Sequence, residues 1–141
     1  MKSRGFTLIE LIIILVIIGI LAVSVSPVFF NNSGTQSQTA RLQAMSILRA
    51  IQQQAMQDTT QAYELEVAEN TLGIPPYTDD NNFQISTAGE ITFSPVGMTI
   101  GFNALGQPTQ GCSGGCTITI TESGGISRAI SINKEGFINA Q

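Results

Sequence analysis

The sequence FTLIELIIILVIIGILAVSVSPVFF, residues 6–30, determines the architecture of the chain because nearly all of its side chains are apolar. As a helix, this stretch would be about 38 Å long at about 1.5 Å per residue. That length exceeds the hydrocarbon core of a bilayer, which is about 30 Å thick. Two basic residues, Lys2 and Arg4, precede the stretch. We therefore expect one transmembrane helix with a cytoplasmic N-terminus and an exported remainder.

Glu10 is the one charged residue in this apolar stretch, and a carboxylate is costly in hydrocarbon. A secretory signal peptide is one interpretation, since Ala22–Ser24 offers a small-residue cleavage site. The apolar region of such a peptide, however, ordinarily has only about 7–15 residues. A plain membrane anchor is a second interpretation. Neither of them explains the carboxylate.

A third interpretation gives Glu10 a partner. If the chain is cut after Gly5, Phe6 gains a free, positively charged amine, and Glu10 lies four residues further on in the first helical turn. The helix dipole favours a carboxylate there by about 0.3–1 kcal/mol. The same carboxylate could neutralise the amine of a neighbouring chain and so fix the relative position of two helices.

The residues that carry this argument, GFTLIE at positions 5–10, resemble the class III signal of type IV prepilins and type II secretion pseudopilins when the long apolar run follows them. The resemblance implies that a membrane prepilin peptidase cuts between Gly5 and Phe6 and that the new amine of Phe6 is methylated. It makes Glu10 the assembly carboxylate. The implied partners are other pilin subunits, the peptidase, the assembly machinery of the bacterial inner membrane, and the membrane itself.

The second part of the chain follows a different pattern. From Thr35, apolar residues recur at helical spacing along a glutamine-rich polar face, which predicts an amphipathic helix ending near Thr59–Thr60. We expect its apolar stripe to pack in a core. The residues assigned to that stripe are Leu42, Met45, Ile47, Leu48, Ile51, Ala55 and Met56.

Beyond residue 64 the chain is predicted to be a loop, at residues 68–82, followed by four or five antiparallel strands in a meander. Turn signals separate the strands. Apolar residues mark the strands at Ile91–Phe93, Met98–Phe102, Ile118–Ile120, Ile126–Ile132 and Phe137–Ile138. The predicted fold class is α+β: a long N-terminal helix, with an apolar transmembrane half and an amphipathic second half, packed against a C-terminal antiparallel sheet.

The predicted organisation is a leader peptide at 1–5, a transmembrane and assembly helix at 6–30, an amphipathic helix at 31–63 that continues into the head, and a head of loop and sheet at 64–141. Two head motifs, FNALGQPT at 102–109 and INKEGFI at 132–138, resemble parts of minor-pilin and pseudopilin-H domains. Together with RAIQQQAMQ and CTITIT, they resemble a minor pilin of the mannose-sensitive haemagglutinin (MSHA) pilus.

Cys112 and Cys116 are the only cysteines, and an exported chain meets an oxidising compartment, so a disulfide between them is expected. Gly114 and Gly115 would let so short a loop close. A redox motif would need C-x-x-C, and a zinc site would need two further ligands in a chain without histidine.

The composition argues against several other functions. The net charge of −4 is unsuited to non-specific nucleic-acid binding. No catalytic constellation is apparent, so neither an enzyme nor a cofactor is expected. Asp79–Asn82 offers oxygen ligands for calcium without the spacing of an EF-hand, so whether it binds calcium is open and no metal site is predicted.

The resemblance implies a type IV pilus subunit, in particular a minor pilin, that is cleaved, methylated and built into a surface filament for adhesion or motility. It would first sit in the inner membrane with its head in the periplasm. A pseudopilin of a type II secretion system is the alternative within this class. A tip module that binds DNA or a glycan is the alternative from another class. The acidic balance, two tyrosines and no tryptophan give the tip module no support.

Overall fold

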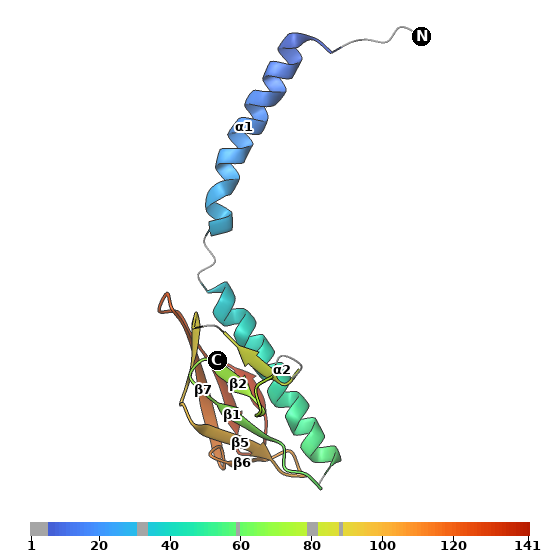
Figure 1. The fold of residues 1–141 in the computed structure, drawn as a ribbon, viewed down its shortest axis with the longest axis vertical. Helices are drawn as coiled ribbons and strands as arrows, with labels where there is room; N and C mark the ends of the chain where they lie inside the picture. Colours follow the sequence, from blue (N-terminus) through green and yellow to red (C-terminus); the bar gives the residue numbers. More distant parts are fainter. Residues whose placement is uncertain (1–5, 31–33, 59, 79–81, 88) are drawn as a thin grey trace, which may run out of the picture. The chain divides into compact units, whose positions relative to one another are not determined.

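The computed structural model describes residues 6–30, 34–58, 60–78, 82–87 and 89–141, with no side chains described for 23–30. The chain divides into two compact units, Met1–Asn32 and Ser33–Gln141 (Figure 1). The first contains helix α1, and the second, which we call the head, contains helix α2 and the strands.

Helix α1, Leu8–Phe30, occupies most of the predicted apolar stretch. Its large apolar side chains from Leu8 to Leu21 are 41–77% exposed. Within the described residues, no helix combines the length and apolarity that a membrane span requires. The predicted span therefore stays a prediction.

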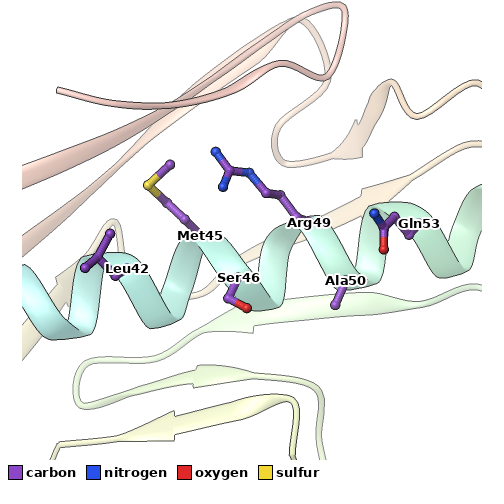
Figure 2. Close-up of a pocket in the computed structure, with 6 residues that line it drawn as sticks. All are labelled: Leu42, Met45, Ser46, Arg49, Ala50 and Gln53. Atoms are coloured by element: carbon purple, nitrogen blue, oxygen red, sulfur yellow. The ribbon is translucent and has the colours of Figure 1, made fainter.

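Helix α2, Thr35–Gln57, is amphipathic as predicted, but two residues assigned to its buried stripe are exposed. Leu42 lines a groove on the outside of α2 (Figure 2), and Met56 is exposed near its C-terminal end. The predicted stripe advanced from Leu42 in steps of three residues, and each such step falls about 60° short of a full turn. Repeated steps of three therefore move the stripe around the helix and away from the buried face. The buried residues follow mixed steps of three and four, which keep them on one face of the helix. They are Ser37, Ala40, Ala44, Met45, Ile47, Leu48, Ile51 and Ala55.

The described part of the head contains nine strands in two antiparallel sheets. The order in the first sheet is β3-β2-β1-β5-β6, and the order in the second is β4-β7-β8-β9. The strands are β1 Glu64–Val67, β2 Thr71–Gly73, β3 Gln84–Ser86, β4 Ile91–Ser94, β5 Met98–Phe102, β6 Pro108–Gln110, β7 Gly115–Glu122, β8 Ser127–Asn133 and β9 Ile138–Ala140.

The α+β class and the antiparallel pairing are confirmed, but the single meander is wrong. Strands β4 and β5 are consecutive in the chain yet belong to different sheets, because β5 pairs with β1 while β4 pairs with β7. The predicted loop at 68–82 contains β2, and β1, β3 and β6 were also missed. These four strands have only three or four residues each, which is too short for a clear alternating pattern.

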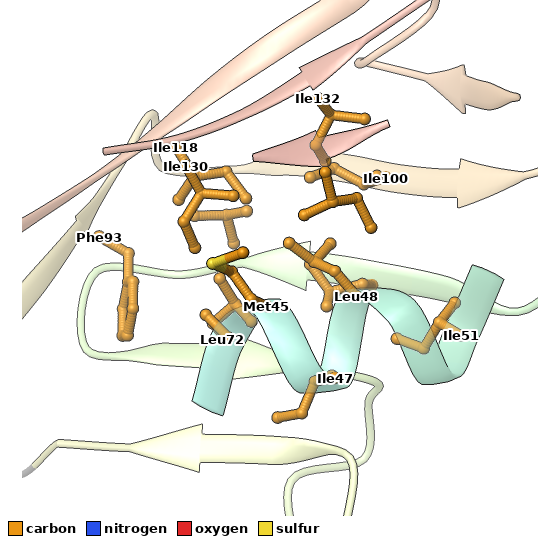
Figure 3. Packing of buried hydrophobic residues seen from close by; sticks show 14 of the residues in the cluster. Met45, Ile47, Leu48, Ile51, Leu72, Phe93, Ile100, Ile118, Ile130 and Ile132 are labelled. Carbon is orange, nitrogen blue, oxygen red and sulfur yellow. The ribbon is translucent and has the colours of Figure 1, made fainter. Parts of the chain in front are cut away.

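One apolar core joins α2 to both sheets (Figure 3). Leu48 and Ile51 of α2 have no exposed surface, and neither do Ile100 of β5, Ile118 of β7 and Ile130 of β8. Burying such a side chain is worth about 1.5–3 kcal/mol relative to leaving it in water. The head thus has a core of its own, built between one helix and two sheets.

The N-terminal end of α2 is held by residues from the second sheet. Gly34 precedes α2 with φ 91°, and no side chain next to it in sequence caps the helix. Instead, the buried Glu122 carboxylate accepts the Gly34 N–H at 2.9 Å. Arg128 donates to the Gly34 carbonyl and to the Ser37 hydroxyl, each at 3.3 Å. We call these four residues the Gly34 cluster. It ties the first turn of α2 to β7 and β8.

The predicted disulfide is present. Cys112 and Cys116 are joined across the turn between β6 and β7, with their Cα atoms 5.0 Å apart. Gly114 and Gly115 both have positive φ angles, 96° and 109°, which explains why glycine is needed in this turn. Cys112 is fully buried, so the bridge also belongs to the core.

Replacing Glu122 tests the Gly34 cluster. We expect Glu122→Ala to lower the free energy of unfolding by about 1–3 kcal/mol, because it leaves the buried Gly34 N–H without an acceptor. Glu122→Gln keeps an acceptor and should cost less. Urea denaturation of the full chain in detergent measures both, with exposed Glu90→Ala as the control. Equal midpoints for Glu122→Ala and Glu90→Ala would contradict the assignment.

Reducing the disulfide tests the second restraint. The closed loop has about five residues, so the chain-entropy model predicts a loss of about 2 kcal/mol in unfolding free energy on reduction. Urea denaturation with and without a thiol reductant measures the difference. The Cys112→Ala/Cys116→Ser double variant should not respond to the reductant. A wild-type midpoint that reductant leaves unchanged would show that the bridge adds nothing to stability.

Candidate assembly site

The start of α1 carries the residues to which the sequence assigned processing and assembly. Phe6 is 72% exposed and lies just before the helix, whereas Gly5 falls outside the described residues. Glu10 lies in the first turn of α1 and is exposed. Phe6 and Glu10 are therefore both accessible at the same end of the helix.

Thr7 and Glu10 contact each other reciprocally. The Thr7 backbone N–H and hydroxyl donate to Glu10 Oε2, each at 3.4 Å. The Glu10 N–H donates to Thr7 Oγ1, also at 3.4 Å. These long contacts form the T-x-x-E capping box of a helix N-terminus. Sequence reasoning missed this role, although the four-residue pattern TLIE at 7–10 displays it.

The capping box gives Glu10 a second role, which is to cap the start of its own helix. A carboxylate that accepts the Thr7 N–H satisfies one of the donors that a helix leaves free at its start. Hydrogen bonds to neutral groups do not neutralise the charge, so the carboxylate still favours a cationic partner. Capping and pairing with an amine are thus compatible roles for one side chain.

The described surface of α1 is apolar around its whole circumference. Between Leu8 and Ala22, Glu10 is the only charged residue, and the large apolar side chains are all exposed. A helix that is apolar all round is covered by lipid or by other protein. In chemical terms, this surface can associate with hydrocarbon or with similar helices.

A groove of about 300 Å³ lies on the outside of α2 (Figure 2). Arg49 is its only charged residue, and the Arg49 guanidinium donates to the Ile138 carbonyl at 3.4 Å. The other lining residues are Leu42, Met45, Ser46, Ala50 and Gln53. This set holds no nucleophile paired with a base.

The Asp58 carboxylate, just beyond α2, has a structural role. The hydroxyl and backbone N–H of Thr60 donate to Asp58 Oδ1, and the Tyr63 hydroxyl donates to Oδ2. These hydrogen bonds lower the pKa of Asp58, and the bond to Asp58 raises the pKa of Tyr63. The contacts tie the segment that leaves α2 back to the end of the helix.

No group of three His, Cys, Asp or Glu side chains within the described residues could hold a metal ion. Asp79, Asp80 and Asn81, which carry most of the calcium hypothesis, lie outside those residues. The calcium hypothesis therefore stays untested.

Comparisons with known proteins agree with both parts of this geometry. Residues 1–26 match a family model described as the prokaryotic N-terminal methylation motif. The fold is similar to that of the Pseudomonas aeruginosa type IV minor pilin FimU in two crystal forms. One superimposes with a TM-score of 0.57 at 18% identity, covering 78% of this chain and 91% of FimU. The other gives 0.54 at 19% identity, covering 74% and 91%. The family match covers the first 26 residues, and the structural likeness shows that the fold is similar to that of FimU.

No curated protein matches the sequence. The narrower resemblance to a minor pilin of the MSHA pilus is not confirmed by these matches and stays a prediction. The roles of Gly5, Phe6 and Glu10 within the matched methylation motif likewise remain predictions for this chain.

Two Thr7 variants test the capping box. We expect Thr7→Val to speed hydrogen exchange of the Glu10 amide several-fold, because valine removes the acceptor at the helix start, a change typically worth about 1 kcal/mol. Thr7→Ser keeps a hydroxyl and should exchange almost like the wild type. Hydrogen exchange of the full chain in detergent, followed by NMR, measures both. Equal exchange in the two variants would contradict the cap.

Proposed function

We propose that this protein is a subunit of a type IV pilus, and specifically a minor pilin. It is cleaved between Gly5 and Phe6, methylated on the amine of Phe6, and held in the bacterial inner membrane through residues 6–30 with its head in the periplasm. It is then built into a surface filament that serves adhesion or motility. One observation carries this proposal: the matched methylation motif opens a helix that is apolar all round and has a single carboxylate in its first turn.

The assembly step follows from an exchange of environments. When α1 moves from lipid into a bundle of similar helices, its apolar side chains gain little, because lipid tails are as apolar as leucine. Apolar contact alone therefore specifies neither the position nor the timing of incorporation. A charge pair between Glu10 and the Phe6 amine of a neighbouring subunit supplies the missing specificity. The inner-membrane assembly machinery supplies the work of extraction.

A pseudopilin of a type II secretion system is the second candidate. The same N-terminal motif serves that function, and FNALGQPT and INKEGFI resemble pieces of pseudopilin-H domains as well as minor pilins. The composition of sheared surface filaments separates the two, because a pilus subunit is found in them and a secretion pseudopilin is not.

Replacing Glu10 tests the assembly role. We expect Glu10→Ala and Glu10→Gln to be cleaved normally after Gly5 but to enter filaments at least tenfold less than the wild type. Glutamine can still serve in a capping box, so the Glu10→Gln variant separates the charge from the cap. Immunoblots of sheared filaments measure incorporation, and the mass of the membrane form measures cleavage.

Glu90→Ala, which removes an exposed carboxylate from the head, is the matched control and should enter filaments normally. Wild-type incorporation of Glu10→Ala would refute the assembly role altogether. Loss with alanine but normal incorporation with glutamine would assign Glu10 to capping alone and contradict the charge pair.

A further inference from the structure

The two sheets in the described part of the head end in four edge strands, and one of these, β3, has an open edge. In an antiparallel sheet, alternate residues direct their backbone N–H and C=O groups toward the neighbouring strand, and the residues between them face away. The Phe83 carbonyl and the Thr87 N–H bond to the segment that contains β2, and Ile85 pairs with β2 between them. Gln84 and Ser86 therefore direct their backbone groups away from β2, and no described residue bonds to those groups.

Two of the other edges are closed by the chain around them. On β6, Pro108 has no N–H to offer, and the outward Gln110 carbonyl accepts the Ser113 N–H at 3.1 Å. On β4, the Phe93 N–H donates to the Glu69 carbonyl at 2.8 Å. An added strand would have to displace these bonds.

The fourth edge, β9, is covered by arginine side chains of α2. Arg49 donates to the Ile138 carbonyl at 3.4 Å, and Arg41 donates to the carbonyl of Gln141, just after β9, at 2.8 Å. Both cations of α2 are thereby engaged with the second sheet. Proteins protect sheet edges in such ways because an unprotected edge readily pairs with another strand. Within the described head, β3 is the edge that has no such protection.

The Gln84 side chain also has an acceptor without a donor. Its Nε2 donates to the Thr78 carbonyl, but its Oε1 is buried and has no hydrogen-bond partner in the described structure. A buried amide oxygen that lacks a donor costs free energy. A donor that another chain brings to this edge would relieve that cost.

A groove of about 250 Å³ lies between β3 and α2. The residues that line it carry no charge; they are Gln43, Ser46, Ile47, Asn82, Gln84 and Ile85. Carboxylates lie nearby in the sequence: Asp79 and Asp80, which are outside the described residues, precede β3, and Glu90 follows it. The Glu90 carbonyl accepts the Ser123 N–H, so Glu90 already lies at the second sheet. A partner at β3 must therefore tolerate carboxylates beyond both ends of the strand.

We propose that β3 pairs with β3 of a second copy of this chain, antiparallel and about a two-fold axis at Ile85. In this register Gln84 of each copy lies opposite Ser86 of the other, and each outward N–H meets an outward carbonyl. Because both copies use the same strand, the contact is satisfied by a pair and does not propagate. The first sheets of the two heads then form one continuous antiparallel sheet.

The side chains of β3 suit a copy of themselves. The Ser86 hydroxyl of the partner copy lies opposite Gln84 and can donate to its Oε1 once the amide turns toward it. Ile85 lies opposite its counterpart, on the face that bears the groove, and adds apolar contact there. None of the three β3 residues is charged, so no like charges meet at the axis. The carboxylates beyond the strand ends repel those of the partner, so the pair is weak and salt should not weaken it further.

This inference goes beyond the proposed function. A filament whose subunits all point the same way uses heterologous contacts, whereas the β3 pair is two-fold symmetric. The pair is therefore a form of the protein outside the filament, and it separates before a subunit is incorporated. It can be detected in the purified protein whether or not the chain enters filaments, so the two proposals fail independently.

Cysteine crosslinking of the full chain in detergent tests the register. The Gln84→Cys and Ser86→Cys variants are purified separately, one of them with an affinity tag, and are then mixed and oxidised mildly. The native cysteines are paired with each other and do not interfere. We expect at least tenfold more disulfide adduct in the mixture than in either variant alone. The opposed positions come within disulfide reach, whereas like positions lie about 7–8 Å apart on the diagonal. Gln84→Cys mixed with Ser94→Cys is the matched control, since Ser94 is an exposed residue of β4.

The Ser86→Pro variant tests the backbone bonds. Proline removes the outward N–H of residue 86 but leaves the bonds to β2, which come from the residues on either side. We expect the dissociation constant of the pair, measured by sedimentation of the full chain in detergent, to rise at least fivefold. The Ser86→Ala variant keeps the N–H and should change it less.

Several outcomes overturn the β3 pair. They are no adduct in the mixture, as much adduct with Ser94→Cys as with Ser86→Cys, or a pair that dissociates when salt is added. A Ser86→Pro variant that keeps the wild-type unfolding midpoint and pairs as tightly as the wild type would also overturn it. If Ser86→Pro does not keep that midpoint, the cysteine mixtures decide the question.

Discussion

Water solvates the apolar surface of α1 poorly, so this helix needs a covering of lipid or of other protein. The apolar side chains from Leu8 to Leu21 are exposed around the whole helix, and one carboxylate interrupts them. Lipid can cover such a helix, and so can other helices like it. Because the two coverings are nearly equal in energy, the proposed charge pair at Glu10 would be enough to decide which of them the helix takes.

The head forms a compact unit of its own, Ser33–Gln141. Its helix, α2, is fastened to the sheets at both ends by polar contacts. At the Gly34 end, Glu122 accepts the Gly34 N–H and Arg128 donates to its carbonyl. Nearer the other end, Gln52 donates to the carbonyl oxygens of Gly106 and Gly136 in two turns between strands. Between these contacts, the apolar core supplies most of the stability.

The sequence predicted what local patterns encode. The apolar run and Glu10 identified the N-terminal motif, helical spacing located α2, and five segments marked by apolar residues became β4, β5, β7, β8 and β9. What it did not predict depends on contacts between distant residues. The division into two sheets depends on β5 choosing β1 over β4, and the roles of Gln52 and Glu122 depend on partners 54 to 88 positions away. The capping box is encoded locally by TLIE, but a carboxylate in an apolar run points first to a charged partner, and this hides its local role.

Whether the Phe6 amine exists in the cell decides whether Glu10 has the cationic partner on which the proposed filament assembly relies. Tandem mass spectrometry of the mature protein, purified from membranes and from filaments, reads its first residue and any modification directly. The chain should begin at Phe6 and carry one methyl group on its amine. A protein that still begins at Met1, or one that begins near Val25 after signal-peptide cleavage, would contradict the proposal, because neither places a free amine beside Glu10.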